Sequence, residues 1–112
     1  MEMTTEVLSE GRIKITLAGS MNATSTEKID LRFNAEVGAA HGAIVDFEKV
    51  DFLASMGIRT LVIAAKALKR KSGRMIILKP IPEVEQVLIS SGVDSLMDIA
   101  HDLDTAVAML VG

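Results

Sequence analysis

Two short apolar runs on either side of a long helical stretch constrain the fold of this chain more than any other feature. The runs occupy residues 42–47 and 74–78, and each has the length and continuity of a strand that is buried on both faces. Between them, residues 55–71 place apolar side chains at helical spacing and end at Ser72-Gly73. Strand, helix and strand in this order predict a crossover unit, with the two strands parallel in one sheet.

The flanking segments extend this pattern in both directions. Residues 4–9 and 12–17 are expected to pair as a hairpin through Glu10-Gly11, because the second segment alternates polar and apolar side chains. Further helices are expected over residues 25–39, over 83–91 and from Asp102 onward, with a last edge strand over 96–99. The side chains expected to point inward from these helices are Ile29, Phe33, Ala35 or Val37, Ala40, Val84, Val87, Leu88, Ala106, Val107 and Leu110. The sequence therefore predicts one α/β domain over residues 1–112, with a mixed, largely parallel sheet of four to five strands and about four helices.

Composition narrows the classes of partner. A net charge of −3 gives no general attraction to nucleic acid or to an anionic membrane, and only 3% of the residues are aromatic, so platforms for stacking bases are scarce. The chain has no cysteine and starts without a basic and apolar leader, which favours a reducing, cytoplasmic location. We expect a monomer that binds neither nucleic acid nor membrane.

No constellation of catalytic residues is visible in the sequence. His41 and His101 lie far apart and are expected to be solvated loop residues. Asp46, Glu48 and Asp51 follow a buried strand, where magnesium sites occur in some α/β proteins, but a polar loop explains them better. We therefore predict no catalytic residue, no metal, no cofactor and no enzymatic activity.

Ser55 falls where the long helix is expected to begin. A serine at that position can cap the helix by accepting hydrogen bonds from the free amides near Gly57 and Ile58. The same place suits an anion, because a phosphate on Ser55 would meet amide donors and the positive end of the helix dipole. Glycine at position 57 would let a phosphate or a partner approach the backbone closely. Ser55 is therefore either an ordinary cap or a site of modification.

The long helix carries two apolar stripes. Successive residues of a helix are rotated by about 100°, and this spacing places one group of apolar residues, the core stripe, on the side expected to face the core. Met56, Ile63 and Ala67 fall on the opposite side together with Thr60, beside a basic margin that includes Arg59. Either another element of the domain or a protein partner is expected to cover this second apolar stripe, and a small one-sided sheet favours the partner. The core stripe consists of Ile58, Leu61, Val62, Ala65 and Leu68, and the basic margin also contains Lys66 and Arg70.

At this segment the chain resembles the STAS domains, particularly the stand-alone anti-anti-sigma factors (anti-sigma factor antagonists) of bacterial partner-switching systems. The resemblance rests on Phe52-Leu53-Ala54-Ser55-Met56-Gly57-Ile58, in which Ser55 matches the phosphorylated serine of the family. Flanking features agree, since residues 19–22 look like the family's Gly-x-Leu-Asp and residues 75–91 look like its strand, turn and helix. The resemblance covers nearly the whole chain and implies a STAS fold.

The resemblance implies a switch between two protein complexes. The unphosphorylated chain would bind an anti-sigma factor that is also a serine kinase of the histidine-kinase-like ATPase fold, and so release the client of that kinase. Phosphorylation of Ser55 would end binding, and a PP2C-type phosphatase would reset the chain. The resemblance and the outward apolar stripe together imply a partner-binding surface. Its expected residues are Ser20, Asn22, Ala54, Met56, Gly57, Arg59, Thr60, Ile63 and Ala67.

Two alternatives remain open from the sequence. A constitutive STAS adaptor, such as a subunit of a stressosome-like or lipid-transport assembly, would keep the fold without the phosphate switch. Ala54 in place of the family's Asp or Ser, and Asn22 in place of an acidic residue, favour this alternative. The second is a small-ligand or nucleotide-binding domain that uses the same helix N-terminus for an anion.

Overall fold

A five-stranded sheet forms the middle of the molecule in the computed structural model, which describes residues 1–111. Strands β1 (Glu2–Ser9), β2 (Arg12–Met21), β3 (Gly42–Leu53), β4 (Met75–Leu78) and β5 (Asp98–Ala100) lie side by side in chain order. Strand β1 runs antiparallel to β2, and every later neighbour is parallel. The predicted fold class, a mixed and largely parallel sheet with crossover helices, is confirmed.

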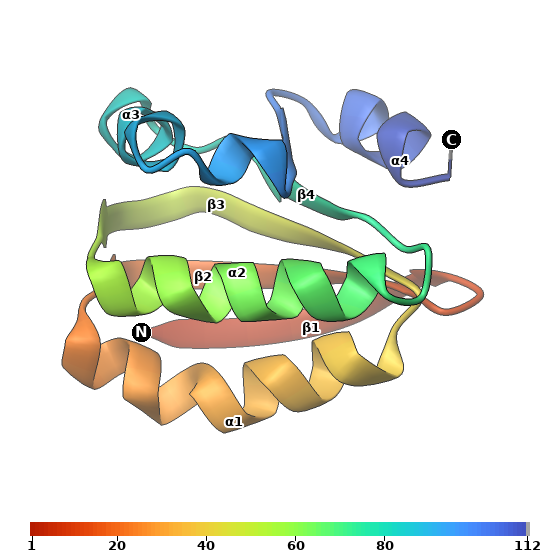
Figure 1. Ribbon diagram of the computed structural model, residues 1–112, viewed down its shortest axis with the longest axis horizontal. Helices are drawn as coiled ribbons and strands as arrows, with labels where there is room; N and C mark the ends of the chain where they lie inside the picture. Colours follow the sequence, from red (N-terminus) through yellow and green to blue (C-terminus); the bar gives the residue numbers. More distant parts are fainter. Residues whose placement is uncertain (112) are drawn as a thin grey trace.

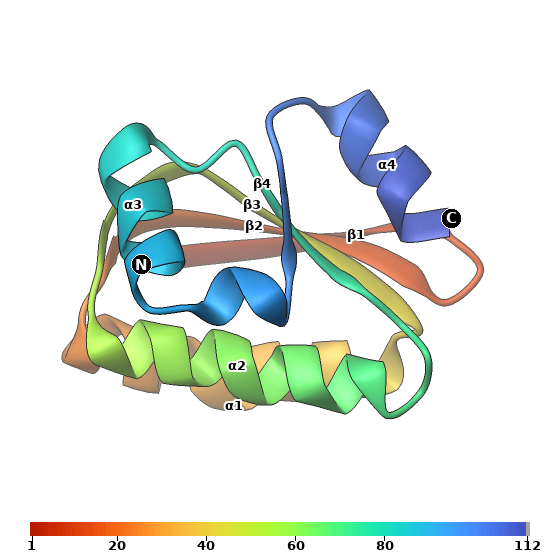
Figure 2. The same cartoon turned by 45° about the horizontal axis from the view of Figure 1, so that its top comes forward.

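Helices cover both faces of this sheet. Helices α1 (Ala23–Ala39) and α2 (Ser55–Lys69) run side by side, and α2 forms the crossover between β3 and β4 (Figure 1). Helix α3 (Pro82–Ser90) and a short 3-10 turn, η1 (Val93–Ser95), lead into β5. Helix α4 (Leu103–Val111) lies across the sheet from α1 and α2 (Figure 2). Among residues 1–111, no helix combines the length and the apolar character needed to cross a membrane.

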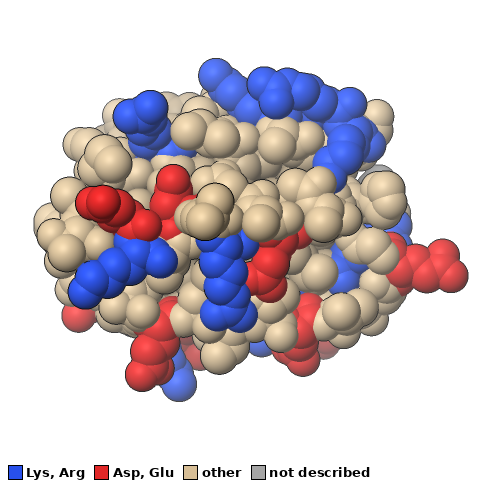
Figure 3. Space-filling view, turned by 90° about the horizontal axis from the view of Figure 1, so that it is seen from below, with Lys and Arg blue, Asp and Glu red and all other residues tan. Residues whose placement is uncertain are grey.

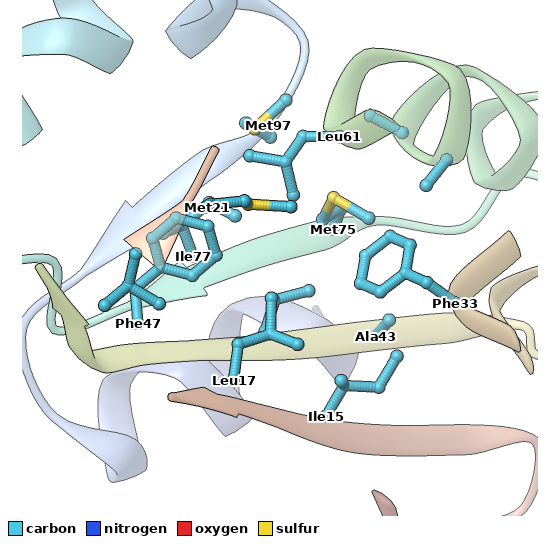
Figure 4. Close-up of a cluster of buried hydrophobic side chains, with 14 of the residues drawn as sticks. Ile15, Leu17, Met21, Phe33, Ala43, Phe47, Leu61, Met75, Ile77 and Met97 are labelled. Carbon is cyan, nitrogen blue, oxygen red and sulfur yellow. The ribbon is translucent and has the colours of Figure 1, made fainter. Parts of the chain in front are cut away.

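The continuous apolar runs of β3 and β4 arise because both faces of these strands are covered. Alternate side chains such as Phe47 and Ile77 point into the main core, where they meet Phe33 of α1 and Leu61 of α2 (Figure 4). The intervening side chains form a second cluster with α4, made of Ile44, Ile76, Leu78, Ala100, Ala106 and Leu110. This two-sided burial fixes the register of the central strands.

Several boundaries and burial predictions need correction. Strands β2 and β3 continue beyond their predicted ends to Met21 and Leu53, since their parallel pairing persists through two register shifts. The last strand is Asp98–Ala100 rather than residues 96–99. Of the predicted alternatives Ala35 and Val37, Val37 is the buried one. Val107 was predicted to point inward but is exposed, because α4 buries Ala106 and Leu110 instead. The side chains of α4 therefore bury one narrow stripe only.

The histidines and the start of α4 lie away from the main core. His41 and His101 are exposed, as expected, and the Nε2 atom of His101 lies 2.8 Å from a carboxylate oxygen of Glu85. Asp102 precedes α4 and accepts hydrogen bonds from the N–H and the hydroxyl of Thr105, each at 2.8 Å. These bonds, the one from the N–H foremost, lower the pKa of the Asp102 carboxyl.

Candidate functional site

The ends of β2 and β3 bring both long helices to one edge of the sheet. Near these ends, Ser20 pairs with Phe52 and Met21 pairs with Leu53. The N–H of Ala54 then donates to the carbonyl of Met21 at 3.0 Å, which extends the pairing by one bond. Helices α1 and α2 both begin immediately after this edge, at the left of Figure 1. The loops that precede the two helices therefore lie together.

Two polar contacts hold the loop before α1. The hydroxyl of Ser20 donates to Oδ1 of Asp51 at 2.6 Å, which ties β2 to β3 at the edge. The Oδ1 atom of Asn22 accepts from the N–H of Ser25 at 2.9 Å, and the N–H of Asn22 donates to the Ser25 hydroxyl at 3.0 Å. This reciprocal pair is a capping box. Asn22 is thus exposed at the predicted surface, yet its side chain already stabilises the start of α1.

Ser55 is the first residue of α2, so of the two alternatives left open by the sequence the ordinary cap is excluded. Ala54 occupies the cap position with an extended backbone, and no side chain among residues 1–111 accepts a cap hydrogen bond there. The first turn also contains no acidic residue. The N–H groups of the first turn therefore remain available as hydrogen-bond donors, and no negative charge offsets the positive end of the helix dipole. The hydroxyl of Ser55 belongs to an exposed residue at this uncapped end.

Gly57, predicted to belong to the partner-binding surface, is buried in the chain. A Cβ atom at this position would lie 2.7 Å from Cδ1 of Leu53 and 2.8 Å from Cγ of Met21. Glycine therefore lets the first turn of α2 pack directly on the ends of β2 and β3. This close packing fixes where Ser55 sits relative to the sheet.

Thr60 is also buried, with 4% of its surface exposed, and does not belong to the outer face. Its hydroxyl donates to Oδ1 of Asp30 at 2.8 Å, and the amide of Asn34 donates to the same oxygen at 3.0 Å. The position faces α1 rather than solvent. The predicted place of Thr60 on the outer side of the helix is wrong, and the residue instead joins α2 to α1.

Replacing Thr60 with Val is expected to lower the free energy of unfolding by about 1 kcal/mol, because the hydrogen bond to Asp30 is lost while the shape is kept. Thr60→Ser, which keeps the hydroxyl, is the matched control. Urea unfolding followed by far-UV circular dichroism measures both, since the chain has no Trp or Tyr for fluorescence. Equal midpoints for Thr60→Val and wild type would contradict this role.

The remaining predicted residues lie on the outer face of α2 or at its start. Met56 is 42% exposed and Ile63 is 48% exposed, and their i,i+7 spacing places them on one side of the helix. Arg59 is exposed beside them, while Ala54 and Ala67 are half-buried. Sequence reasoning missed Phe52, which is 53% exposed just before α2. Adjacent strand residues face opposite ways, so of Phe52 and Leu53 only one was able to enter the core.

Four cavities of the described residues 1–111 have volumes of about 170 to 350 Å³, and Ser55 lines none of these four. In the same described part of the chain, no group of three or more His, Asp or Glu side chains is placed to hold a metal ion. Asp46 instead lies 3.6 Å from Lys14 and accepts from the N–H of Glu48 at 3.0 Å.

Known proteins resemble this chain both in sequence and in fold. It is 26% identical over 100 residues to the "Putative anti-sigma factor antagonist BtrV" of Bordetella bronchiseptica, covering 88% of this chain and 86% of that protein. Among solved structures, an anti-sigma factor antagonist from Thermotoga maritima, also named putative, superposes with a TM-score of 0.89 at 13% identity, covering 98% and 95% of the two chains. The phosphorylated form of the Bacillus cell fate determinant SpoIIAA superposes with a TM-score of 0.73 at 24% identity, covering 96% and 98%.

These structural likenesses establish the fold, and the family follows from a match along the sequence. The STAS domain family model matches residues 4–106, which include every strand but the first two residues of β1 and every helix but the last five residues of α4. The match thus contains the whole edge at which α1 and α2 begin. The chain belongs to the STAS domain family.

Proposed function

We propose that this chain is a cytoplasmic anti-sigma factor antagonist that works by partner switching. Its unphosphorylated form binds an anti-sigma factor that is also a serine kinase of the histidine-kinase-like ATPase fold, and the kinase then releases its client. Phosphorylation of Ser55 ends the complex, and a PP2C-type phosphatase restores the binding form. In this scheme the chain is a ligand and a substrate rather than a catalyst.

The observation that carries the proposal is the exposed Ser55 at the uncapped start of α2. A kinase needs to reach the hydroxyl, and at this position no side chain in the described residues makes a cap hydrogen bond to the first-turn amides. A phosphate attached there would be held by the same amides and by the helix dipole. The fold would therefore accept the modification without rearranging.

The switch itself follows from charge. In the kinase reaction, the Ser55 oxygen would attack the γ-phosphorus of ATP, ADP would leave, and the hydroxyl proton would pass to a base of the kinase. The product carries about −1.5 to −2 additional charges at neutral pH. Next to the exposed Met56 and Ile63, this charge has to be desolvated when an apolar partner surface docks. Binding is thereby weakened.

The names of similar proteins support the same function. The Bordetella bronchiseptica relative is named as an anti-sigma factor antagonist, and so is SpoIIAA in its unphosphorylated form. SpoIIAA is also known in a phosphorylated form. Antagonism controlled by phosphate is therefore the function that best joins the family to the exposed serine of this chain.

Incubation with ATP and the kinase encoded beside this chain's gene tests the proposal. We expect a single phosphate-affinity gel shift for wild type, no shift for Ser55→Ala, and reversal of the shift by a PP2C-type phosphatase. Ser91→Ala, which alters another exposed serine, is the matched control and should shift like wild type. Identical migration of wild type and Ser55→Ala would refute phosphorylation at Ser55.

A further inference from the structure

Four positively charged side chains lie on the outer side of α2 and at its C-terminal cap. They are Arg59, Lys66, Lys69 and Arg70, here called the cationic strip, and all four are exposed. The chain has no Asp or Glu between Ser55 and Arg70, although its net charge is −3. Figure 3 shows Lys and Arg side chains gathered along the upper edge of this view, over α2. The charge of this helix is therefore opposite to that of the whole chain.

In the described residues 1–111, none of the four side chains of the cationic strip forms a salt bridge or a hydrogen bond. Some other cations do have such roles: Arg32 pairs with Glu36, Arg74 pairs with Asp98, and the amine of Lys71 donates to carbonyls at the end of α1. Within residues 1–111 the exposed Lys28 and Lys49 are unpaired too, but they lie on separate elements, whereas the strip gathers its unpaired cations along one helix.

The dipole of α2 explains only part of the strip. Cations in the last turn of a helix gain about 0.3 to 1 kcal/mol from the dipole, which accounts for Lys66 and Lys69. Arg59 lies in the second turn, where the dipole disfavours a cation. The complete absence of acidic residues from α2 also exceeds what the dipole requires.

The strip is continuous with the proposed switch. At about 100° per residue, Ser55, Arg59, Lys66 and Arg70 fall within one sector of about 60° on the side opposite the buried residues. They extend over about 22 Å along the helix, since each residue rises about 1.5 Å. Met56 and Ile63 flank this line. A partner that contacts Ser55 and follows the helix therefore meets cations and apolar side chains together.

We infer that the cationic strip docks an acidic, amphipathic surface of the anti-sigma factor, an inference that rests on the proposed function. Charge complementarity sets the sign of the partner surface, and the interleaved Met56 and Ile63 require apolar side chains within it. A protein meets both conditions. Nucleic acid and membrane fit less well, since the chain as a whole is negative and has only three aromatic residues.

The cationic strip also suggests how a phosphate on Ser55 would weaken binding of the partner. A phosphate on Ser55 would stand at one end of the strip and repel the acidic partner surface along its length. Arg59, one turn away at i+4, would be drawn toward the phosphate and lost to the partner. Modification would thus oppose both the apolar and the electrostatic part of the contact.

Two double variants of equal net charge test the strip. Lys66→Glu with Arg70→Glu reverses two of the four charges of the strip, whereas Lys28→Glu with Lys49→Glu reverses two exposed cations outside it, and each pair changes the net charge from −3 to −7. Binding of the anti-sigma factor encoded beside this chain's gene is measured calorimetrically at about 50 and about 300 mM NaCl, where charge screening differs strongly. We expect the strip variant to bind at least about tenfold more weakly at low salt, and the control within about threefold of wild type.

Each outcome of this experiment has a distinct meaning. Equal losses in the two double variants, while wild type binds, would overturn the strip and leave the proposed function standing. A wild-type chain that does not bind the anti-sigma factor would overturn both. Binding of a DNA duplex or of phosphatidylglycerol vesicles by wild type, lost in the strip variant, would overturn a protein as the occupant. Circular dichroism melts of all variants confirm that they are folded.

Discussion

Ser55→Asp is expected to weaken binding of the anti-sigma factor by at least about 30-fold, or about 2 kcal/mol, because a charge is placed in the contact. The same substitution should make the chain slightly more stable. Helix α2 starts without an acidic residue, and an Asp in its first turn gains about 0.3 to 1 kcal/mol from the dipole. Affinity and stability should therefore change in opposite directions.

Ser55→Asn is the matched control for this prediction, since it keeps the shape of Asp without its charge. It should bind the anti-sigma factor within about threefold of wild type, a difference of less than about 1 kcal/mol. Calorimetry measures the affinities, and thermal melts by circular dichroism measure the stabilities. If Ser55→Asp binds as tightly as Ser55→Asn, phosphate control is refuted and the constitutive STAS adaptor becomes the better hypothesis.

Gly73→Ala is expected to lower the free energy of unfolding by about 3 kcal/mol, the upper end of the usual cost of overpacking. An added Cβ atom would lie 2.1 Å from the carbonyl oxygen of His41 and 3.2 Å from that of Leu68. Both atoms belong to the backbone, so no change of rotamer relieves the contact. Gly73 follows α2 and its N–H donates to Leu68 at 2.8 Å, which brings β4 alongside the start of β3.

Gly38→Ala is the matched control, because it makes the same chemical change in open space. A Cβ at Gly38, within α1, would meet nothing within 4 Å. Alanine is favoured over glycine in a helix, so this variant should be about 0.5 to 1 kcal/mol more stable than wild type. Urea unfolding by circular dichroism compares the two, and a Gly73→Ala protein as stable as Gly38→Ala would contradict the close approach at His41.

The fold was predictable because burial on both faces leaves a strong pattern in the sequence. Residues 42–47 and 74–78 are predicted as buried strands because their side chains are apolar on both faces. One set of alternate side chains packs against α1 and α2, and the other set packs against α4. The core stripe of α2 was predicted in the same way, although Ile58 and Val62 are only partly buried at its margin. Periodicity identifies which face of each strand or helix is buried, and this information is sufficient to assign the class of fold.

The sequence by itself determined that a serine lies at the start of a helix with apolar and basic side chains outside its core stripe. Only the tertiary structure decided which residue caps that helix and which side chains are free. The hydrogen bonds between β2 and β3 end with the N–H of Ala54 bonded to the carbonyl of Met21. Ala54 therefore becomes the cap of α2, and Ser55 becomes the first residue of that helix. Neighbours in space, which periodicity does not reveal, likewise bury Thr60 against α1 and leave the cations of α2 unpaired within residues 1–111.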